Sequence, residues 1–217
     1  MSIDEDLIIK NKSYYTSGSL GFNYVFNDRH SVGATYEVNI NPYSRGGWNS
    51  LMDVWKNGSK TESYTNDMYC RFKSRPTQDI TAYYAGQIGK VSIEWNGEIY
   101  LRKTGQTQYS EETGMEGGDS RTIESDFTAD SWMHASKLVL SFPVWKGTLK
   151  IGNEFTESCR ANLYTIDEQG TDLPGKTDDQ VKESNLAAFV SYGLRLNKVE
   201  LNAGLRYEHV SSNYYNT

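Results

Sequence analysis

The chain lacks the segments that mark several common protein classes. It contains no run of 18 apolar residues, which excludes a membrane-spanning helix. Its 22 Lys and Arg are outnumbered by 28 Asp and Glu, and the net charge of -6 argues against nucleic acid as a partner. The first residues, Met1 to Asp6, have no basic segment and no apolar core, so they do not form a signal peptide.

Proline, cysteine and hydrophobic residues are also scarce. Only four prolines occur, and 13% of the residues are aromatic. Both features argue against a disordered chain. Cys70 and Cys159 leave two possibilities open: two unpaired thiols, which we favour, or a disulfide near the cell surface. Hydrophobic residues make up 37% of the chain, less than in a usual soluble domain. Sixteen Tyr and 19 Gly in so polar a chain indicate β-structure with many turns.

Period-two alternation of apolar and polar side chains is the dominant pattern, and it recurs in eight segments. In the first segment, every second residue from Tyr14 to Phe26 falls on one face. We therefore predict an all-β protein, an antiparallel up-and-down meander of about eight long strands that forms a segment of a transmembrane β-barrel. The expected strands are residues 13–26, 31–41, 63–88, 91–103, 125–142, 147–160, 183–196 and 198–212.

The predicted connections alternate between short and long. Short turns are expected near residues 28, 89, 145 and 197. Long polar loops are expected over about 41–60, 104–124 and 161–182. Outer-membrane barrels have short periplasmic turns and long extracellular loops, so this asymmetry favours a barrel. Within the third strand we expect a bulge or a break at Pro76, because proline cannot donate to a β-ladder.

The apolar faces predict contact with lipid. Trp132 and Phe142 are ten residues apart, which at a tilt of about 40° spans roughly 25 Å, the height of a lipid-facing band. The alternative is that these aromatics form the core of a soluble sandwich. His134 shares this face and fits lipid less well. The aromatic residues that we expect in the interfacial girdles are Tyr14, Tyr24, Trp95, Trp132, Phe142 and Tyr207.

The opposite, polar face is where we expect the aqueous lumen and contacts with a plug domain or a substrate. The candidate residues on this face are Glu94, Glu98, Arg102, Lys150, Glu154, Arg195, Arg206 and Glu208. Paired carboxylates can serve a glycosidase, but a ladder of charges that pair across strands is the interpretation we favour. In the first long loop, the aromatics expected to contact a ligand at the cell surface are Tyr43, Trp48 and Trp55.

Catalytic and metal-binding motifs are missing from the sequence. No GxSxG, P-loop or HExxH motif occurs. His30, His134 and His209 lie in different segments without ligand spacing, so we predict no metal site and no cofactor. The protein is therefore not expected to be an enzyme.

Two short motifs resemble a known family. Residues 183–190, ESNLAAFV, and 203–208, AGLRYE, resemble the barrels of TonB-dependent receptors of the Bacteroidetes, and more narrowly the outer membrane protein beta-barrel family. Residues 82–90, AYYAGQIGK, resemble a recurrent hairpin of that family. The resemblance implies the outer membrane of a Gram-negative bacterium and a barrel of about 22 strands plugged by an N-terminal domain. It also implies uptake of a large or scarce nutrient (a chelate, glycan or peptide), energised indirectly by the TonB complex.

The chain departs from the full pattern of that family. It carries no plug domain, only eight of the strands and no terminal aromatic strand after Asn216. We therefore expect an internal segment, from a truncated gene or an expressed piece, whose partners are outer-membrane lipid, the plug domain and the remaining strands of the parent receptor.

Two other functions are compatible with alternating strands. The first is a stand-alone small barrel with a structural or lipid-binding role, since eight strands can close with side chains filling the inside. The second is a soluble β-sandwich that acts as a binding module. Pairing between the first and last strands distinguishes the small closed barrel from a barrel segment. We predict that these strands do not pair and that the sheet is open.

Overall fold

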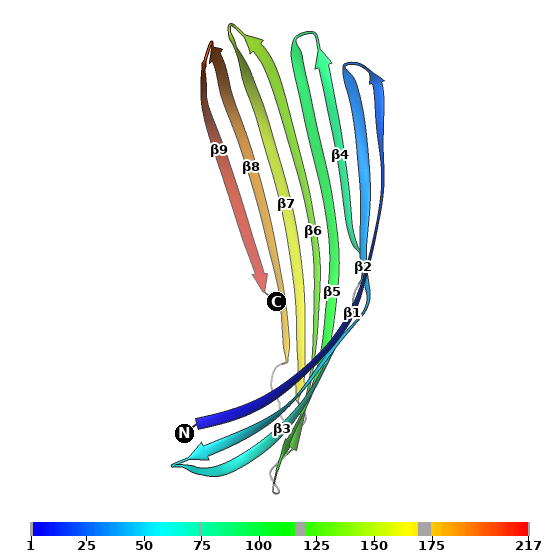
Figure 1. The fold of residues 1–217 in the computed structure, drawn as a ribbon, viewed down its shortest axis with the longest axis vertical. Coiled ribbons are helices and arrows are strands. Elements are labelled where there is room, and N and C mark those ends of the chain that lie inside the picture. Colours follow the sequence, from blue (N-terminus) through cyan, green and yellow to red (C-terminus); the bar gives the residue numbers. More distant parts are fainter. Residues whose placement is uncertain (1, 74, 116–119, 169–174, 217) are drawn as a thin grey trace.

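The computed structural model describes residues 2–73, 75–115, 120–168 and 175–216, and within them the chain forms one antiparallel sheet of nine strands (Figure 1). None of the described segments is a helix able to cross a membrane. The all-β antiparallel meander expected from the alternation is confirmed. The strands are β1 (Ser2–Asn27), β2 (His30–Lys56), β3 (Ser59–Phe72), β4 (Thr77–Ile88), β5 (Val91–Gly114), β6 (Ser120–Val144), β7 (Gly147–Glu168), β8 (Lys176–Leu196) and β9 (Val199–Asn216).

The third expected strand is interrupted. Both β3 and β4 pair with β2 on one side and with β5 on the other, so together they fill one place in the sheet. The break falls between Phe72 and Thr77 and includes Pro76, which has no N–H to donate. Below the break, β3 and the adjoining parts of β1 and β2 sweep sideways from the rest of the sheet (Figure 1).

The strands are longer than the alternation indicated. Residues 41–60 were expected to form a loop but belong mostly to β2 and β3, which meet in a two-residue turn. In the same way, β5 runs on to Gly114 and β7 to Glu168. The expectation of long loops over 41–60, 104–124 and 161–182 was therefore wrong for most of their length. The physical reason is that a strand exposed to water on both faces needs no apolar alternation, because its ladder of backbone hydrogen bonds holds it.

The tight turns take backbone conformations that their residues permit. Asn57 and Gly58, between β2 and β3, both have positive φ angles, 54° and 78°. This is the type I′ geometry that matches the twist of a hairpin. Positive φ also occurs at Gly89, Trp145 and Asn197, in the short turns expected near residues 89, 145 and 197.

The register assigns each side chain to a face, because directly opposed residues of antiparallel strands point to the same side. Tyr84, Trp95 and Leu138 lie opposite one another on β4, β5 and β6. The same row continues through Asn153 of β7 to Ala188 of β8. Neighbouring rows repeat the pattern in most segments, so their apolar positions fall on one face. We call this the apolar face and the other the polar face. Met68, Cys70 and Phe72 of β3 are exceptions, because Phe72 lies opposite Gln106, on the other side of β5 from Trp95.

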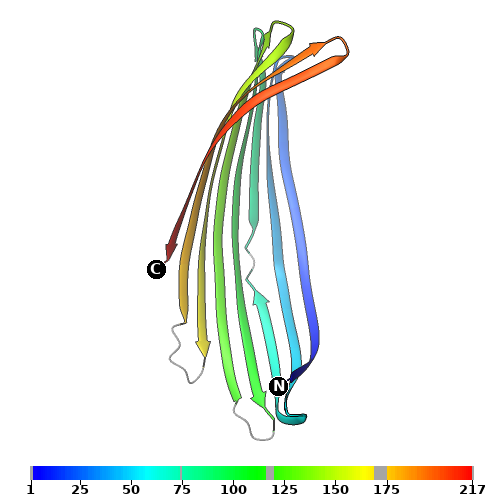
Figure 2. The ribbon, with the colours of Figure 1, turned by 90° about the vertical axis from the view of Figure 1, so that its left-hand side faces the viewer.

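The apolar face is not covered by protein in the described part of the chain. Leu20 is 78% exposed, Leu205 79% and Tyr207 70%. A soluble sandwich would bury such side chains beneath a second sheet, and the single sheet excludes that alternative. The outer strands β1 and β9 do not pair with each other among the described residues, so the sheet is an open, curved wall and not a closed small barrel (Figures 1 and 2).

A single layer has no interior, and the buried residues reflect this. They are small side chains overlaid by their neighbours on the sheet: Cys70, Ala129, Val139, Cys159, Ala187, Ser44, Ser50, Ser63, Ser110 and Ser125. Both cysteines are free thiols, which decides between the two possibilities raised by the sequence. They lie on β3 and β7, with β5 and β6 between them.

Candidate functional site

The polar face gathers the charged residues that the alternation placed there. One row crosses the sheet from Asn96 on β5 through Lys137, Glu154 and Ala187 to Glu208 on β9. Arg206 lies in the next row, opposite Phe189. Side chains from four strands therefore meet on one side of the wall.

Four of these side chains form a connected ion-pair network. The Lys137 ammonium lies 2.6 Å from one Glu154 carboxylate oxygen, and an Arg206 guanidinium nitrogen lies 2.5 Å from the other. Arg206 also donates to Glu208. Each arginine or lysine contact here is charge-assisted, and the fork of Arg206 bridges two carboxylates. Residues far apart in the sequence are thereby fixed relative to one another.

An aromatic ring lies at the centre of this network. Phe189 extends over Gly152, where any Cβ would collide with the ring. Lys137 Nζ lies 5.8 Å from the ring centroid and the Arg206 guanidinium carbon 5.9 Å, which are cation–π distances. The glycine leaves room for the ring against β7, and the two cations that contact the ring are those that pair with Glu154. We call Lys137, Glu154, Phe189, Arg206 and Glu208 the polar-face cluster.

The other predicted luminal residues lie on the same face but outside this cluster. Glu94 is opposite Val139, and Glu98 is opposite Ala135. Lys150 is opposite Ser141 and Ser191. Arg195 faces Glu200 across the β8–β9 pair. Their contacts with a plug domain or a substrate stay predictions.

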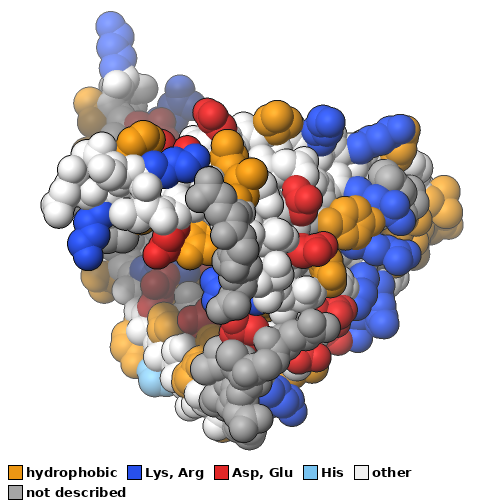
Figure 3. Space-filling view, turned by 90° about the horizontal axis from the view of Figure 1, so that it is seen from below, with side chains coloured by type: hydrophobic (Ala, Val, Ile, Leu, Met, Phe, Trp, Pro, Cys, Tyr) orange, Lys and Arg blue, Asp and Glu red, His pale blue; other side chains and the backbone are white. Residues whose placement is uncertain are grey.

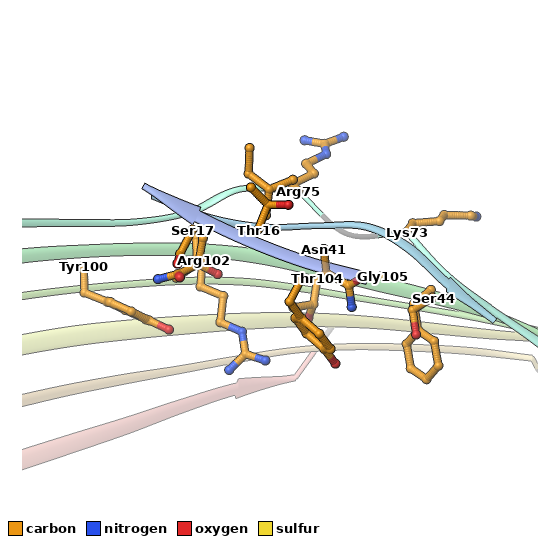
Figure 4. A pocket seen from close by; sticks show the side chains of 15 residues that line it. Thr16, Ser17, Asn41, Ser44, Lys73, Arg75, Tyr100, Arg102, Thr104 and Gly105 are labelled. Carbon is orange, nitrogen blue, oxygen red and sulfur yellow. The ribbon is translucent and has the colours of Figure 1, made fainter. Parts of the chain in front are cut away.

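A hollow of about 460 Å³ opens where β3 and β4 are interrupted. Tyr100, Arg102 and Thr104 of β5 project to one side of the sheet there, whereas Lys73 and Arg75 project to the other (Figure 4). Ser17 of β1 and Asn41 of β2 complete the rim. Hydroxyl, amide and guanidinium groups line the hollow on the polar face, and such groups suit a ligand rich in oxygen atoms.

The expected girdle aromatics lie on the apolar face. Trp95 Nε1 donates to Ser136 Oγ at 3.0 Å, and Tyr24 packs edge-to-face on Phe26 at 4.8 Å between centroids. Tyr14, Phe142 and Tyr207 belong to the same face through their partners in the register. His134 stacks on Trp132 at 5.6 Å with rings nearly parallel, and its Nε2 is 3.6 Å from Glu157. His134 on β6 and Glu157 on β7 are therefore polar residues within the apolar face.

Tyr43, Trp48 and Trp55 were expected in a surface loop, and that placement was wrong. All three lie in β2, where Trp48 is opposite Met68 and Trp55 is opposite Lys60. The hairpin of β2 and β3 presents Trp48 and Trp55 from a paired strand. Ligand contact by these residues stays a prediction.

Two members of the polar-face cluster were missed by sequence reasoning, Lys137 and Phe189. Both were detectable, because each has the opposite parity to its apolar neighbours Leu138 and Val190. The signal for Phe189 was an aromatic residue at a position where the alternation places polar side chains. No group of three or more metal-ligating side chains occurs among the residues that the structure describes.

Comparison with known proteins decides the family. Residues 89–217 match the sequence profile of the Outer membrane protein beta-barrel family. The chain belongs to that family. It is accordingly a protein of the outer membrane, and its exposed apolar face is the face that meets lipid. A search of curated proteins finds no match.

Two solved structures, one of a transporter and one of a receptor, overlap the chain at low similarity. The ferric citrate transporter FecA, in its unliganded form, aligns with 96% of this chain at 10% identity and a TM-score of 0.35. BauA, the ferric preacinetobactin receptor of Acinetobacter baumannii, aligns with 97% of the chain at 9% identity and a TM-score of 0.41. The chain spans 38% and 41% of the lengths of these two proteins.

Proposed function

We propose that this chain forms part of the barrel wall of a TonB-dependent outer-membrane receptor that takes up a large or scarce nutrient. The observation that carries the proposal is the open sheet with two dissimilar faces. Its apolar face is exposed to lipid, its polar face holds the ion-pair network of Arg206, and its edge strands β1 and β9 lack partners among the described residues. A wall of this kind is useful only when further strands complete it, because bare edges aggregate.

The polar-face cluster is the proposed contact for a plug domain or a passing substrate. Charged groups held at fixed separations on a luminal wall can pair with a plug domain and be released when the plug moves. The proposed substrate classes are a metal chelate, a glycan or a peptide, and the TonB complex acts on the plug and not on this wall. The proposed role is not catalytic. A Bacteroidetes source is part of the same proposal.

The coding sequence on either side of this chain tests the proposed architecture. We expect a plug domain upstream and further β-strands downstream, to a total near 22 strands. A flanking sequence that encodes neither would overturn the assignment to a receptor.

Uptake by the parent receptor tests the proposed role of the polar face. Arg206→Gln removes the bridge between Glu154 and Glu208, and we expect slower uptake of the substrate while the amount of folded receptor stays the same. The matched control is Lys60→Gln, which breaks an ion pair with Asp53 on the β2–β3 hairpin. Equal uptake by the Arg206 variant and the wild type would argue against a luminal function for this cluster.

A further inference from the structure

The turn between β6 and β7 holds a tryptophan in an unfavourable backbone conformation. Trp145 has a φ of 52°, and the residue is 76% exposed. The first residues of two other short turns, Gly89 and Asn197, also have positive φ, but these residue types adopt it at little cost. A bulky residue there is an outlier, and strain of this kind concentrates at functional sites. The conformation of Trp145 therefore indicates a function for its side chain.

Neighbouring side chains hold this turn in place. The Tyr192 hydroxyl donates to the carbonyl oxygen of Val144, the residue before Trp145, at 3.1 Å. The Tyr192 ring lies against Gly147, where an added Cβ would be 2.7 Å from ring carbon Cζ. Lys146 Nζ lies 5.8 Å from the centroid of the Trp145 ring, within cation–π range. Contacts before and after Trp145 thus fix the turn that carries it.

A hollow of about 600 Å³ lies beside this turn, on the polar face of β7, β8 and β9. Its volume is within the range of ligand-binding pockets. Longer side chains border it, among them Trp145, Lys150 and Arg195. Small residues form its floor: Thr148, Ser191, Gly193 and Gly204. A floor of small residues between longer side chains makes a groove at the short-turn end of the sheet, and we call it the turn groove.

Cations predominate around the turn groove, although the chain as a whole carries a net charge of -6. The charged residues that border it in the described part of the chain are Lys146, Lys150, Arg195 and Glu200. Glu200 lies opposite Arg195, whose five N–H donors can serve this carboxylate and a second one. At the other end of the molecule, Asp and Glu side chains share the surface with Lys and Arg (Figure 3). The turn groove therefore favours an anionic ligand.

The spacing of the cations distinguishes between kinds of anionic ligand. Lys150 lies opposite Ser191, and Arg195 is four residues farther along β8, so the two cations are roughly 13 Å apart along the strand direction. A single phosphate group does not span this distance. An extended peptide places every second side chain on one side, so its carboxylates at positions four residues apart are also separated by roughly 13 Å.

We propose that the turn groove binds an acidic peptide segment in an extended conformation. Its carboxylates pair with Lys150 and Arg195, and an apolar side chain of the segment packs on Trp145. Tryptophan and arginine are the residues that most often dominate binding at protein interfaces. Because short turns of outer-membrane barrels lie in the periplasm, the segment reaches the groove from that side. The groove and the membrane location of the chain support this binding independently of the proposed transport role.

Fluorescence anisotropy of a labelled peptide with the full-length protein in a maltoside detergent tests the proposal. The probe is a short peptide with glutamate at every second position and leucine at one end, and the comparison peptide has glutamine in place of glutamate. We expect Trp145→Gly to bind the acidic peptide at least about tenfold more weakly than the wild type. This variant should resist urea at least as well as the wild type, because glycine accepts the positive φ.

A pair of double variants tests the cations. Lys150→Gln/Arg195→Gln should also weaken binding of the acidic peptide at least about tenfold. The matched control, Arg29→Gln/Lys90→Gln, removes the same charge from two short turns outside the groove and should bind like the wild type. Equal losses in the two double variants would overturn the site, since net charge would then explain the binding. Wild-type affinity in the Trp145→Gly variant would overturn it as well.

Two measurements on the wild type alone keep the test independent of variant folding. Raising the salt concentration should release the acidic peptide, and binding of the glutamine peptide should be weak and insensitive to salt. Inorganic pyrophosphate should compete only poorly, because it lacks an apolar side chain to pack on Trp145. Equal binding of the two peptides, or full displacement by pyrophosphate at the peptide's own concentration, would contradict the proposal.

Discussion

At the scale of single residues, the polar face depends on glycine where an aromatic ring lies against the sheet. A Cβ added to Gly152 would lie 2.7 Å from the Leu138 carbonyl oxygen and would collide with the Phe189 ring. Because the carbonyl belongs to the ladder, it cannot move without disturbing β6 and β7. Gly18, on β1, has open space instead, with no atom within 4 Å of an added Cβ.

Gly152→Ala should therefore destabilise the folded protein. We expect a loss of about 1–3 kcal/mol in the free energy of unfolding, which is the usual cost of overpacking. Urea unfolding of the full-length protein in lipid vesicles measures it. Gly18→Ala is the control and should leave the free energy nearly unchanged. Equal stabilities of the two variants would show that Phe189 can leave the sheet at no cost.

The members of the candidate site could be predicted only in part at this scale. Glu154, Arg206 and Glu208 follow from parity, because a polar residue between apolar ones must face the other way. That Arg206 pairs with Glu154 could not be predicted, since it depends on the register between β7, β8 and β9. The register depends on both paired strands, so the sequence of one strand does not determine it.

At the scale of elements, the β2–β3 hairpin carries its own turn signal. Asn57-Gly58 is the preferred pair for a type I′ turn, and the sequence shows it plainly. We nevertheless expected a loop over residues 41–60, because the residues that flank this turn do not alternate cleanly between apolar and polar. Near the membrane, alternation predicted which face of the sheet each side chain lies on. It did not predict where the strands end, because the strand ends lie in polar sequence in which the alternation stops.

Gly58→Ala should weaken this hairpin. Gly58 has a φ of 78°, and an L-residue with a Cβ costs roughly 1–2 kcal/mol in the left-handed region. Hydrogen exchange of the β2 and β3 amides nearest the turn should speed up accordingly. Asn57→Gly keeps the positive φ accessible and should leave the protection nearly as it is. Unchanged exchange in the Gly58 variant would mean that packing, and not the turn, holds the hairpin.

The same hairpin should respond to acid through Asp53. The hydroxyl of Ser63 donates to the Asp53 carboxylate at 2.5 Å, and the Lys60 ammonium lies 2.9 Å from it. The hydrogen bond from Ser63, and after it that from Lys60, lower the pKa of this carboxyl below its ordinary value. A lowered folded-state pKa means that the stabilisation is present above the unfolded pKa, about 4, and is lost as pH falls through the folded value.

Asp53→Asn should therefore remove an acid-dependent step in hairpin stability. In the wild type, we expect the protection factors of the β2–β3 amides to fall as the pH drops below about 4. In the variant they should already be reduced at neutral pH and change less in acid. A wild-type protection profile that is flat in acid would contradict the role of this carboxylate.

At the scale of the whole molecule, the two faces of the sheet should respond oppositely to a new charge. Leu205 and Ser191 lie on neighbouring strands and face opposite ways, since Leu205 is opposite Val190 and Ser191 is opposite Gly204. An arginine that faces lipid costs about 2–4 kcal/mol near the bilayer midplane, whereas one that faces a wet lumen costs little.

Leu205→Arg should accordingly reduce assembly of the full-length protein into membranes, and Ser191→Arg should leave assembly intact. Resistance of the folded barrel to unfolding in detergent during electrophoresis measures this. If Ser191→Arg reduced assembly and Leu205→Arg did not, the assignment of the lipid-facing and luminal faces would be reversed. The polar-face cluster would then not be luminal. An open sheet was predicted, but alternation alone did not require it, because eight alternating strands can also close into a small barrel.

The unbroken pairing of β5 with β6 bears on how this protein resists proteolysis. Their register runs without a shift from Ser92 and Ser141 to Thr113 and Ser120, a length of roughly 70 Å. A protease must thread a single extended backbone through its cleft, and along this hairpin the backbone is already held by its neighbour. A protease would therefore find little free backbone to cleave along these two strands.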